Sequence, residues 1–68
     1  MIELLTRAHE APFKTKSNFA RDNADLVAMA ASDGFITNKM ATGLYVRRWH
    51  ITPLGLSYLY TLKGLHHA

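Results

Sequence analysis

The chain has no cysteine and no long apolar run. With 0 Cys among its 68 residues, disulfides, thiolate zinc sites and thiol chemistry are excluded, and a reducing cytoplasm is the typical setting. No stretch approaches the roughly 18 consecutive apolar residues of a membrane span, and the N-terminal residues lack the pattern of a signal peptide. We expect a cytoplasmic protein without membrane contact, forming a single domain over residues 1–68 with residues 64–68 as a frayed tail.

Acidic residues are missing from the second half. All 5 Asp and Glu precede Gly34, whereas residues 34–68 carry only cations among their charged side chains, namely Lys39, Arg47, Arg48 and Lys63. A half without acids favours a polyanionic partner such as nucleic acid. The alternative is a basic surface that only keeps the protein in solution.

Apolar spacing predicts helices in the first half. A first helix is expected over residues 2–9, ended by Pro12, and residues 13–16 are too short and mixed to assign. A second, amphipathic helix is expected over residues 17–32, with Ser17 as its N-cap.

The second helix has an alternative reading as two short helices. Asn23 could cap a helix of its own, with Arg21-Asp22 as a tight turn before it. The single helix is preferred. In both readings Gly34 fits the left-handed position that follows a helix end.

The periodicity changes after Gly34. Residues 35–37 and 44–51 are rich in β-branched and aromatic side chains and predict two strands, joined by a turn-rich loop over residues 38–43. Thr52 and Pro53 predict the N-cap and first position of a final helix over residues 53–62. The chain is therefore expected to be an α+β domain.

The last helix and the only tryptophan supply the expected core of the second half. The residues spaced for burial are Leu54, Tyr58, Leu59 and Leu62, and Trp49 is expected inside the domain. Tyr60 and Leu65 are expected to be exposed. Because a domain this small has a thin core, we expect a homodimer through the C-terminal helix.

Two segments resemble parts of the winged helix-turn-helix family. Residues 26–37 (LVAMAASDGFIT) resemble a recognition helix that closes on a glycine before two apolar residues start the wing. Residues 45–55 (YVRRWHITPLG) resemble the returning wing strand and its apolar-Thr-Pro-x-Gly step into a final helix. Together with the preceding helix, the resemblance covers residues 17–62.

This resemblance implies a small winged-helix domain that binds DNA. Its expected order is a helix, then one helix or two, a β-hairpin wing and a C-terminal helix. The size and compact wing also look like small phage- or prophage-encoded regulators. If residues 17–32 form one helix, the chain keeps the wing but lacks the turn of a helix-turn-helix, and major-groove reading is then in doubt.

Cations and amide donors form two candidate DNA-binding groups. The wing offers Asn38, Lys39, Arg47 and Arg48 for phosphates or the minor groove, and the start of the second helix offers Ser17, Asn18 and Arg21, extended by Lys14 and Lys16. The alternatives are a solvated strand edge for the two arginines and helix capping for Ser17 and Asn18. Asp22 and Asp25 argue against phosphate contact at the second helix.

Neither a metal site nor catalysis is expected. The histidines His9, His50, His66 and His67 lack the fixed spacing of zinc ligands. The sequence has no nucleophile–base pair, no carboxylate pair in an apolar setting and no glycine-rich phosphate loop. We expect no enzyme activity, no cofactor and no metal.

The sequence thus leads to a small regulator that binds double-stranded DNA as a dimer. A winged-helix module that contacts a host or phage protein without binding DNA is the alternative, motivated by the acids of the second helix and the aromatic residues of the last. Binding of RNA or a single strand through Tyr45 and Trp49 ranks third.

Overall fold

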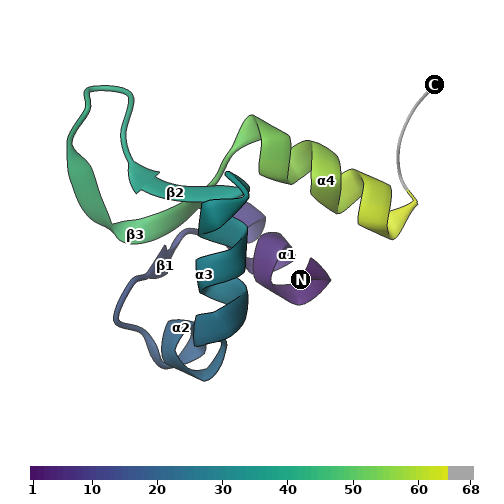
Figure 1. The fold of residues 1–68 in the computed structure, drawn as a ribbon, viewed down its shortest axis with the longest axis horizontal. Coiled ribbons are helices and arrows are strands. Elements are labelled where there is room, and N and C mark those ends of the chain that lie inside the picture. The colour runs from purple at the N-terminus through teal and green to yellow at the C-terminus, as the bar shows by residue number, and fades with distance from the viewer. Residues whose placement is uncertain (65–68) are drawn as a thin grey trace.

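The computed structural model describes residues 1–64, which form an α+β fold. Its elements in chain order are α1 (Ile2–Glu10), β1 (Phe13–Lys14), α2 (Asn18–Asp22), α3 (Ala24–Ser32), β2 (Ile36–Lys39), β3 (Tyr45–Ile51) and α4 (Pro53–Lys63). The three strands form an antiparallel sheet in the order β1-β3-β2. The β2–β3 hairpin and α4 project from opposite sides of the body that α1, α2 and α3 form with the sheet (Figure 1).

The second helix is divided, so the preferred single helix over residues 17–32 is wrong. The break falls at Asn23, whose φ of −119° and ψ of 30° are not helical. The Asn23 side chain donates a 2.9 Å hydrogen bond back to the Phe19 carbonyl and makes no cap to α3. The Asn23 carbonyl still accepts a 2.8 Å hydrogen bond from the Val27 N–H, so Asn23 is the N-cap of α3, as in the two-helix alternative. The turn lies at Asn23 itself, one residue after the expected Arg21-Asp22 turn.

The end of α3 follows the expected glycine signal. Gly34 has a φ of 79°, a left-handed conformation that favours glycine. Its N–H donates to the Ala31 carbonyl, and the Phe35 N–H donates to the Ala30 carbonyl at 2.8 Å. These two bonds form a Schellman motif and satisfy carbonyls that the helix end leaves open.

The strands differ from the expectation at their ends. Residues 13–14, left unassigned, form β1, in which Phe13 pairs with Trp49 of β3. The first strand of the hairpin starts at Ile36 and continues to Lys39, so Asn38 and Lys39 belong to β2 rather than to the loop. The two residues of β1 are too few to show a periodicity in the sequence, and they pair with a strand far along the chain.

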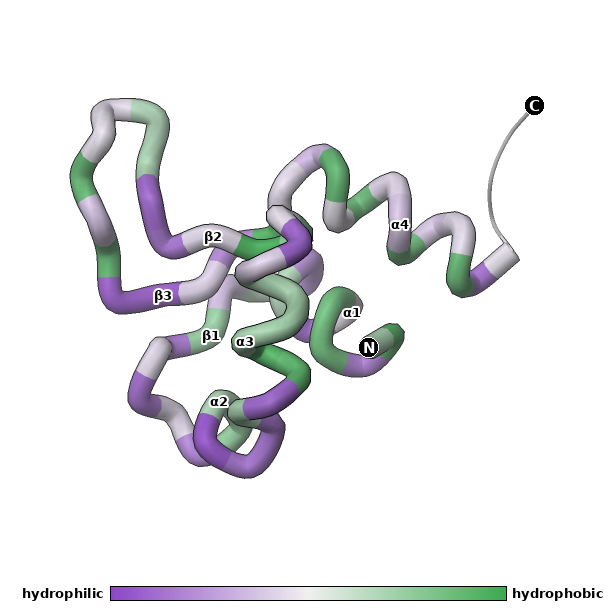
Figure 2. Tube along the Cα trace, in the orientation of Figure 1, coloured by the Kyte–Doolittle hydropathy of each residue, from purple (hydrophilic) through white to green (hydrophobic). Residues whose placement is uncertain are grey.

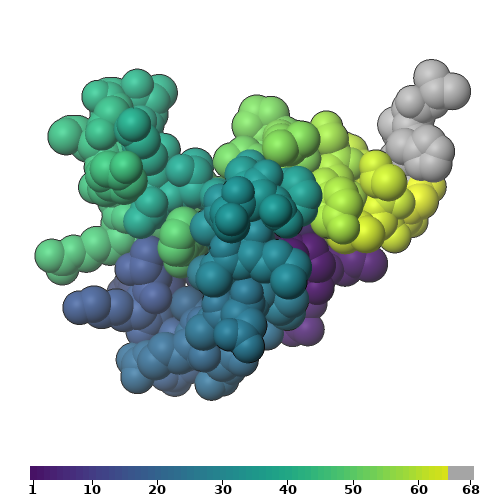
Figure 3. Space-filling view, viewed as in Figure 1, coloured from purple at the N-terminus to yellow at the C-terminus, as the bar shows by residue number. Residues whose placement is uncertain are grey.

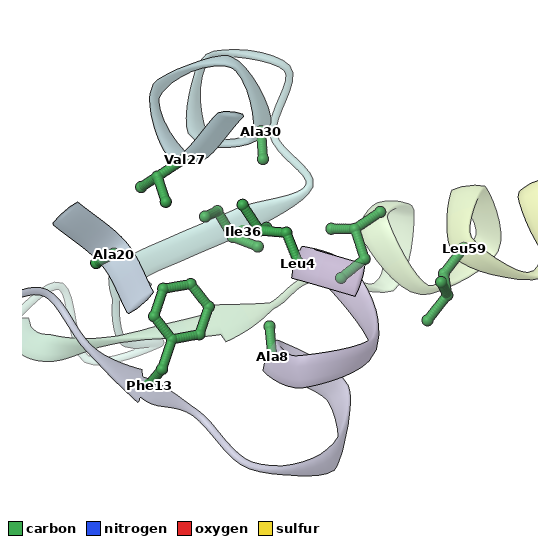
Figure 4. Close-up of a cluster of buried hydrophobic side chains, with 9 residues drawn as sticks. Leu4, Ala8, Phe13, Ala20, Val27, Ala30, Ile36 and Leu59 are labelled. Carbon is green, nitrogen blue, oxygen red and sulfur yellow. The ribbon is translucent and has the colours of Figure 1, made fainter. Parts of the chain in front are cut away.

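The core lies between the helices and the sheet. Its buried side chains come from all four helices and from β1 and β2, and they are Leu4, Leu5, Ala8, Phe13, Ala20, Val27, Ala30, Ile36 and Leu59 (Figure 4). No side chain of β3 is fully buried. Trp49, expected in the core, is half-buried and packs against this cluster. Because the hairpin runs away from the helices, only its base reaches the core.

The burial predicted for α4 is wrong for most of its residues. Gly55 and Leu59 are buried, but Leu54, Tyr58 and Leu62 are exposed, as Tyr60 is. The cause is that α4 packs mainly on α1, so a single narrow stripe is covered. Tyr58 still stacks on Phe35, with ring centroids 4.4 Å apart.

The start and end of α4 match the sequence signals. Thr52 is the N-cap, Pro53 is the first residue of the helix, and Gly64 follows its end in a left-handed conformation. The remainder of the expected frayed tail, residues 65–68, lies outside the described residues, as does the expected exposure of Leu65. None of the helices described for residues 1–64 is long and apolar enough to cross a membrane.

Candidate nucleic-acid interface

Four of the predicted site residues meet on one surface, which we call the basic cluster: Lys14, Lys16, Arg47 and Arg48. Together with Thr15 they line one open depression beside β1 and β3, and none of the lining residues is acidic. The neighbouring Phe13 is buried and packs edge-on against Phe19, 5.1 Å between ring centroids. Phe13 therefore fixes β1 against the core, and Lys14, the next residue, lies exposed on the surface.

Like charges stand opposite each other in the basic cluster. Lys14 pairs with Arg48 across the β1–β3 ladder, and the Thr15 N–H donates a 3.0 Å hydrogen bond to the Arg47 carbonyl. Residues directly opposite in an antiparallel pair have Cβ atoms about 4.5–5.5 Å apart, and like charges there are destabilising. A bound anion between the two side chains would relieve this repulsion.

Arg21 adjoins the basic cluster. Its Nη2 donates a 3.0 Å hydrogen bond to the carbonyl of Lys16, which ties α2 to the segment after β1. Arg21 also lines a shallow apolar groove together with Trp49 and the alanines of α3. The guanidinium therefore extends the positive surface from β1 towards α2.

Ser17 acts as the helix cap that was the alternative to phosphate binding. Its Oγ accepts a 3.2 Å hydrogen bond from the Ala20 N–H. Asn18, the first residue of α2, is exposed beside it. Because α2 has only five residues, its macrodipole adds little to any anion site.

The structure separates Asn38 and Lys39 from the basic cluster. Both residues lie on β2, while β1 lies on the opposite edge of β3. The Lys39 ammonium lies 5.9 Å from the centroid of the Tyr45 ring, a cation–π distance. Lys39 therefore belongs to the outer hairpin rather than to the surface formed by β1 and β3.

The outward face of α3 has little that could read DNA bases. Its exposed residues are Ala24, Asp25, Ala28, Met29 and Ser32. Direct reading of base edges relies chiefly on Arg, Lys, Asn and Gln, and none of these occurs in α3. Asp22 and Asp25 flank the turn into α3, where they would repel phosphates. This helix is apolar and slightly acidic, unlike the basic cluster.

The end of the hairpin carries exposed apolar side chains. Met40, Leu44 and Tyr45 are 42%, 70% and 71% exposed. Figure 3 shows the hairpin standing clear of the body of the molecule. Along the trace in Figure 2, apolar segments near this end give way to strongly hydrophilic ones where β3 approaches β1.

Sequence reasoning missed one relationship in this interface, the pairing of Lys14 with Arg48. The alternation of apolar and polar residues in Phe13-Lys14-Thr15 is typical of a strand and could have indicated it. The partner strand follows some 30 residues later, so the sequence alone offered no register.

The fold and the basic cluster define a small α+β protein with a cation-rich sheet edge. Comparison with known sequences identifies its family. The chain is 35% identical to the gene 5.7 protein of Enterobacteria phage T3 over 63 residues, which cover 93% of this chain and 91% of that protein. The chain belongs to the family of phage gene 5.7 proteins.

A second relative is longer. The chain is 35% identical over 63 residues to the fusion protein 5.5/5.7 of Escherichia phage T7, and the match spans 37% of that protein's length. No family model matches the chain, and no solved structure matches it.

Proposed function

We propose that the chain is a winged-helix protein that binds duplex DNA through its phosphates and does not read the bases. The order α1-β1-α2-α3-β2-β3-α4, with a short first strand beside the hairpin, supports this fold. In it, α2 and α3 with the turn at Asn23 are the helix-turn-helix, and the β2–β3 hairpin is the wing. Membership of a phage protein family supports a phage-related role. That this role is regulatory is part of the proposal.

The observation that carries DNA binding is the like-charge pair of Lys14 and Arg48 within the basic cluster. Such a pair costs stability in the free protein, and a regularly spaced polyanion offsets that cost. Contacts to phosphates fix position without sequence information, which agrees with an α3 face that lacks base-reading side chains. Binding is therefore expected to be electrostatic and weakly selective.

The salt dependence of binding tests this function. Fluorescence anisotropy with a mixed-sequence 20-bp duplex measures the binding constant at salt concentrations from 50 to 200 mM. We expect the logarithm of the binding constant to fall with the logarithm of the salt concentration with a slope of about −3 to −4. Each phosphate neutralised contributes about −0.9 to that slope, and the basic cluster offers its four cations. A folded protein that fails to bind at 50 mM salt would overturn the proposal.

A matched pair of charge reversals locates the interface. Arg48→Glu removes a cation from the basic cluster, whereas Lys63→Glu makes the same change at the exposed end of α4. We expect Arg48→Glu to weaken binding at 50 mM salt at least tenfold and to reduce the slope by one unit or more. Equal losses in the two variants would mean that net charge, not the cluster, drives binding.

The outward face of α3 favours a second candidate function, contact with a protein. Met29 is 54% exposed and lies among small apolar residues beside Asp25, a surface that suits a protein better than DNA. Asp25→Asn separates the candidates, because it removes repulsion only if α3 approaches phosphates. Several-fold tighter DNA binding by Asp25→Asn would place α3 at the duplex. Protein contact would be supported if Asp25→Asn leaves DNA binding unchanged and if a protein that can be crosslinked to the wild type is no longer crosslinked to Met29→Lys.

A further inference from the structure

The end of the β2–β3 hairpin, residues 40–44, presents apolar side chains from a defined turn. The Met40 N–H donates a 2.8 Å hydrogen bond to the Leu44 carbonyl, and the Gly43 N–H donates to the Met40 carbonyl at 2.9 Å. Gly43 has a φ of 89°, as in a three-residue hairpin loop whose last residue is left-handed. The turn therefore holds Met40 and Leu44 opposite each other, directly after β2 and directly before β3.

These side chains contribute nothing to the core. Leu44 is 70% exposed, and the core cluster contains neither it nor Met40. Single exposed apolar residues are ordinary, but neighbouring ones at the end of a projecting element indicate a contact surface. The tip adds to the exposed surface of the free protein without stabilising its fold.

Two arginines lie at a distance from the tip that slightly exceeds the depth of the DNA minor groove. Arg47 and Arg48 lie three and four residues after Leu44, or about 10–13 Å along a strand. The minor groove of B-DNA is about 7.5 Å deep. A side chain at the tip can therefore reach the floor of the groove while the arginines stay near the phosphates at its rim.

We propose that the hairpin tip is an apolar wedge that enters the minor groove and bends the duplex, with Leu44 as its leading side chain and Met40 beside it. This inference rests on the proposed DNA binding. Proteins that kink DNA in this way insert Leu, Met, Phe, Ile or Pro at a base step. An apolar pocket on a protein is the competing receptor. Lys39 next to the tip, and Arg47 and Arg48 further along β3, favour a polyanion instead.

The wedge is tested by measuring the bend of bound DNA. A 30-bp duplex with a central TA step, labelled at its ends with a donor and an acceptor dye, is saturated with protein at 50 mM salt. Energy transfer is compared for the wild type, Leu44→Ser and the control Leu54→Ser, which makes the same change at an exposed leucine of α4. Circular dichroism verifies that each variant is folded.

The wild type is expected to bend the duplex within the range of about 20–90° seen for apolar wedges. Leu44→Ser should bind with at most tenfold weaker affinity but lose at least half of the change in energy transfer. Leu54→Ser and the conservative Leu44→Met should bend DNA as the wild type does. Replacing the TA step by an A-tract should weaken binding, because the stiffer sequence resists a kink.

Two results would overturn the wedge while leaving DNA binding intact. One is a saturated wild-type complex with a straight duplex, and the other is full bending by Leu44→Ser. Either would show that the exposed tip does not bend the duplex. A folded wild type that does not bind the duplex at 50 mM salt would instead overturn the proposed function, and the wedge with it.

Discussion

The Thr52 hydroxyl donates a 2.6 Å hydrogen bond to the carbonyl of Gly34, residues that lie 18 positions apart in the sequence. The same oxygen accepts a 2.9 Å hydrogen bond from the Gly55 N–H at the start of α4. The Thr52 N–H also donates to the Phe35 carbonyl at 2.9 Å. One side chain therefore joins the end of α3 to the start of α4 and fixes the base of the hairpin between them.

Replacing Thr52 by alanine should destabilise the fold. Thr52→Ala loses the cap of α4 and the bond to Gly34, at a cost of about 1–2 kcal/mol. For a domain of this size each kcal/mol lowers Tm by about 4–8 °C. Thermal unfolding followed by circular dichroism measures the change. Thr52→Ser keeps the hydroxyl and should retain most of the stability, so equal losses would contradict the role of the oxygen.

Replacing the buried Gly55 by alanine should destabilise the fold. A Cβ at residue 55 would collide with the carbonyl oxygen of Phe35 and lie 2.8 Å from its carbonyl carbon and 3.0 Å from Ile51 Cγ1. Because the obstacle is backbone, α4 has to shift, and overpacking of this kind costs about 1–3 kcal/mol or more. Urea unfolding gives the free energy. Ser57→Ala, on the exposed side of α4, should be neutral.

The cap at Ser17 should contribute to stability rather than to DNA binding. Ser17→Ala removes the hydrogen bond to the Ala20 N–H and should cost about 1 kcal/mol. The salt dependence of the binding constant of Ser17→Ala for the 20-bp duplex should have the same log–log slope as that of the wild type, because no charge is lost. Ser17→Asp restores a capping acceptor and should recover stability. A slope lowered by a full unit in Ser17→Ala would instead indicate a phosphate contact.

The exposed apolar face of α4 should support a homodimer, which we propose as the missing stabilisation of a thin core. Tyr58 and Leu62, four residues apart and therefore on the same side of the helix, are 37% and 36% exposed, and Lys63 is the single charged residue of α4. Sedimentation equilibrium should show a monomer–dimer equilibrium, and Tm should rise with protein concentration. Leu62→Glu should give a folded monomer, whereas Ser57→Glu should leave association unchanged. A concentration-independent monomer would refute the dimer.

The sequence by itself determined the elements whose signals are local. Ser17, Gly34, Thr52 and Gly64 cap or stop helices where they were expected to, because each acts on backbone groups within a few residues. The apolar stripe of α1 was equally readable, since Leu4, Leu5 and Ala8 repeat with the helical period. The lack of acids after residue 33 was likewise a property of the chain alone.

Tertiary structure decided everything that depends on which elements meet. The exposure of Leu54 and Tyr58 followed from α4 packing mainly on α1, which no helical period reveals. The break at Asn23 was open in the sequence, where one helix and two fitted the same pattern. The pairing of Lys14 with Arg48 gathered separate cations into the basic cluster and left Lys39 outside it. Strand register joins residues far apart in the chain, so only the folded sheet fixes where charge accumulates.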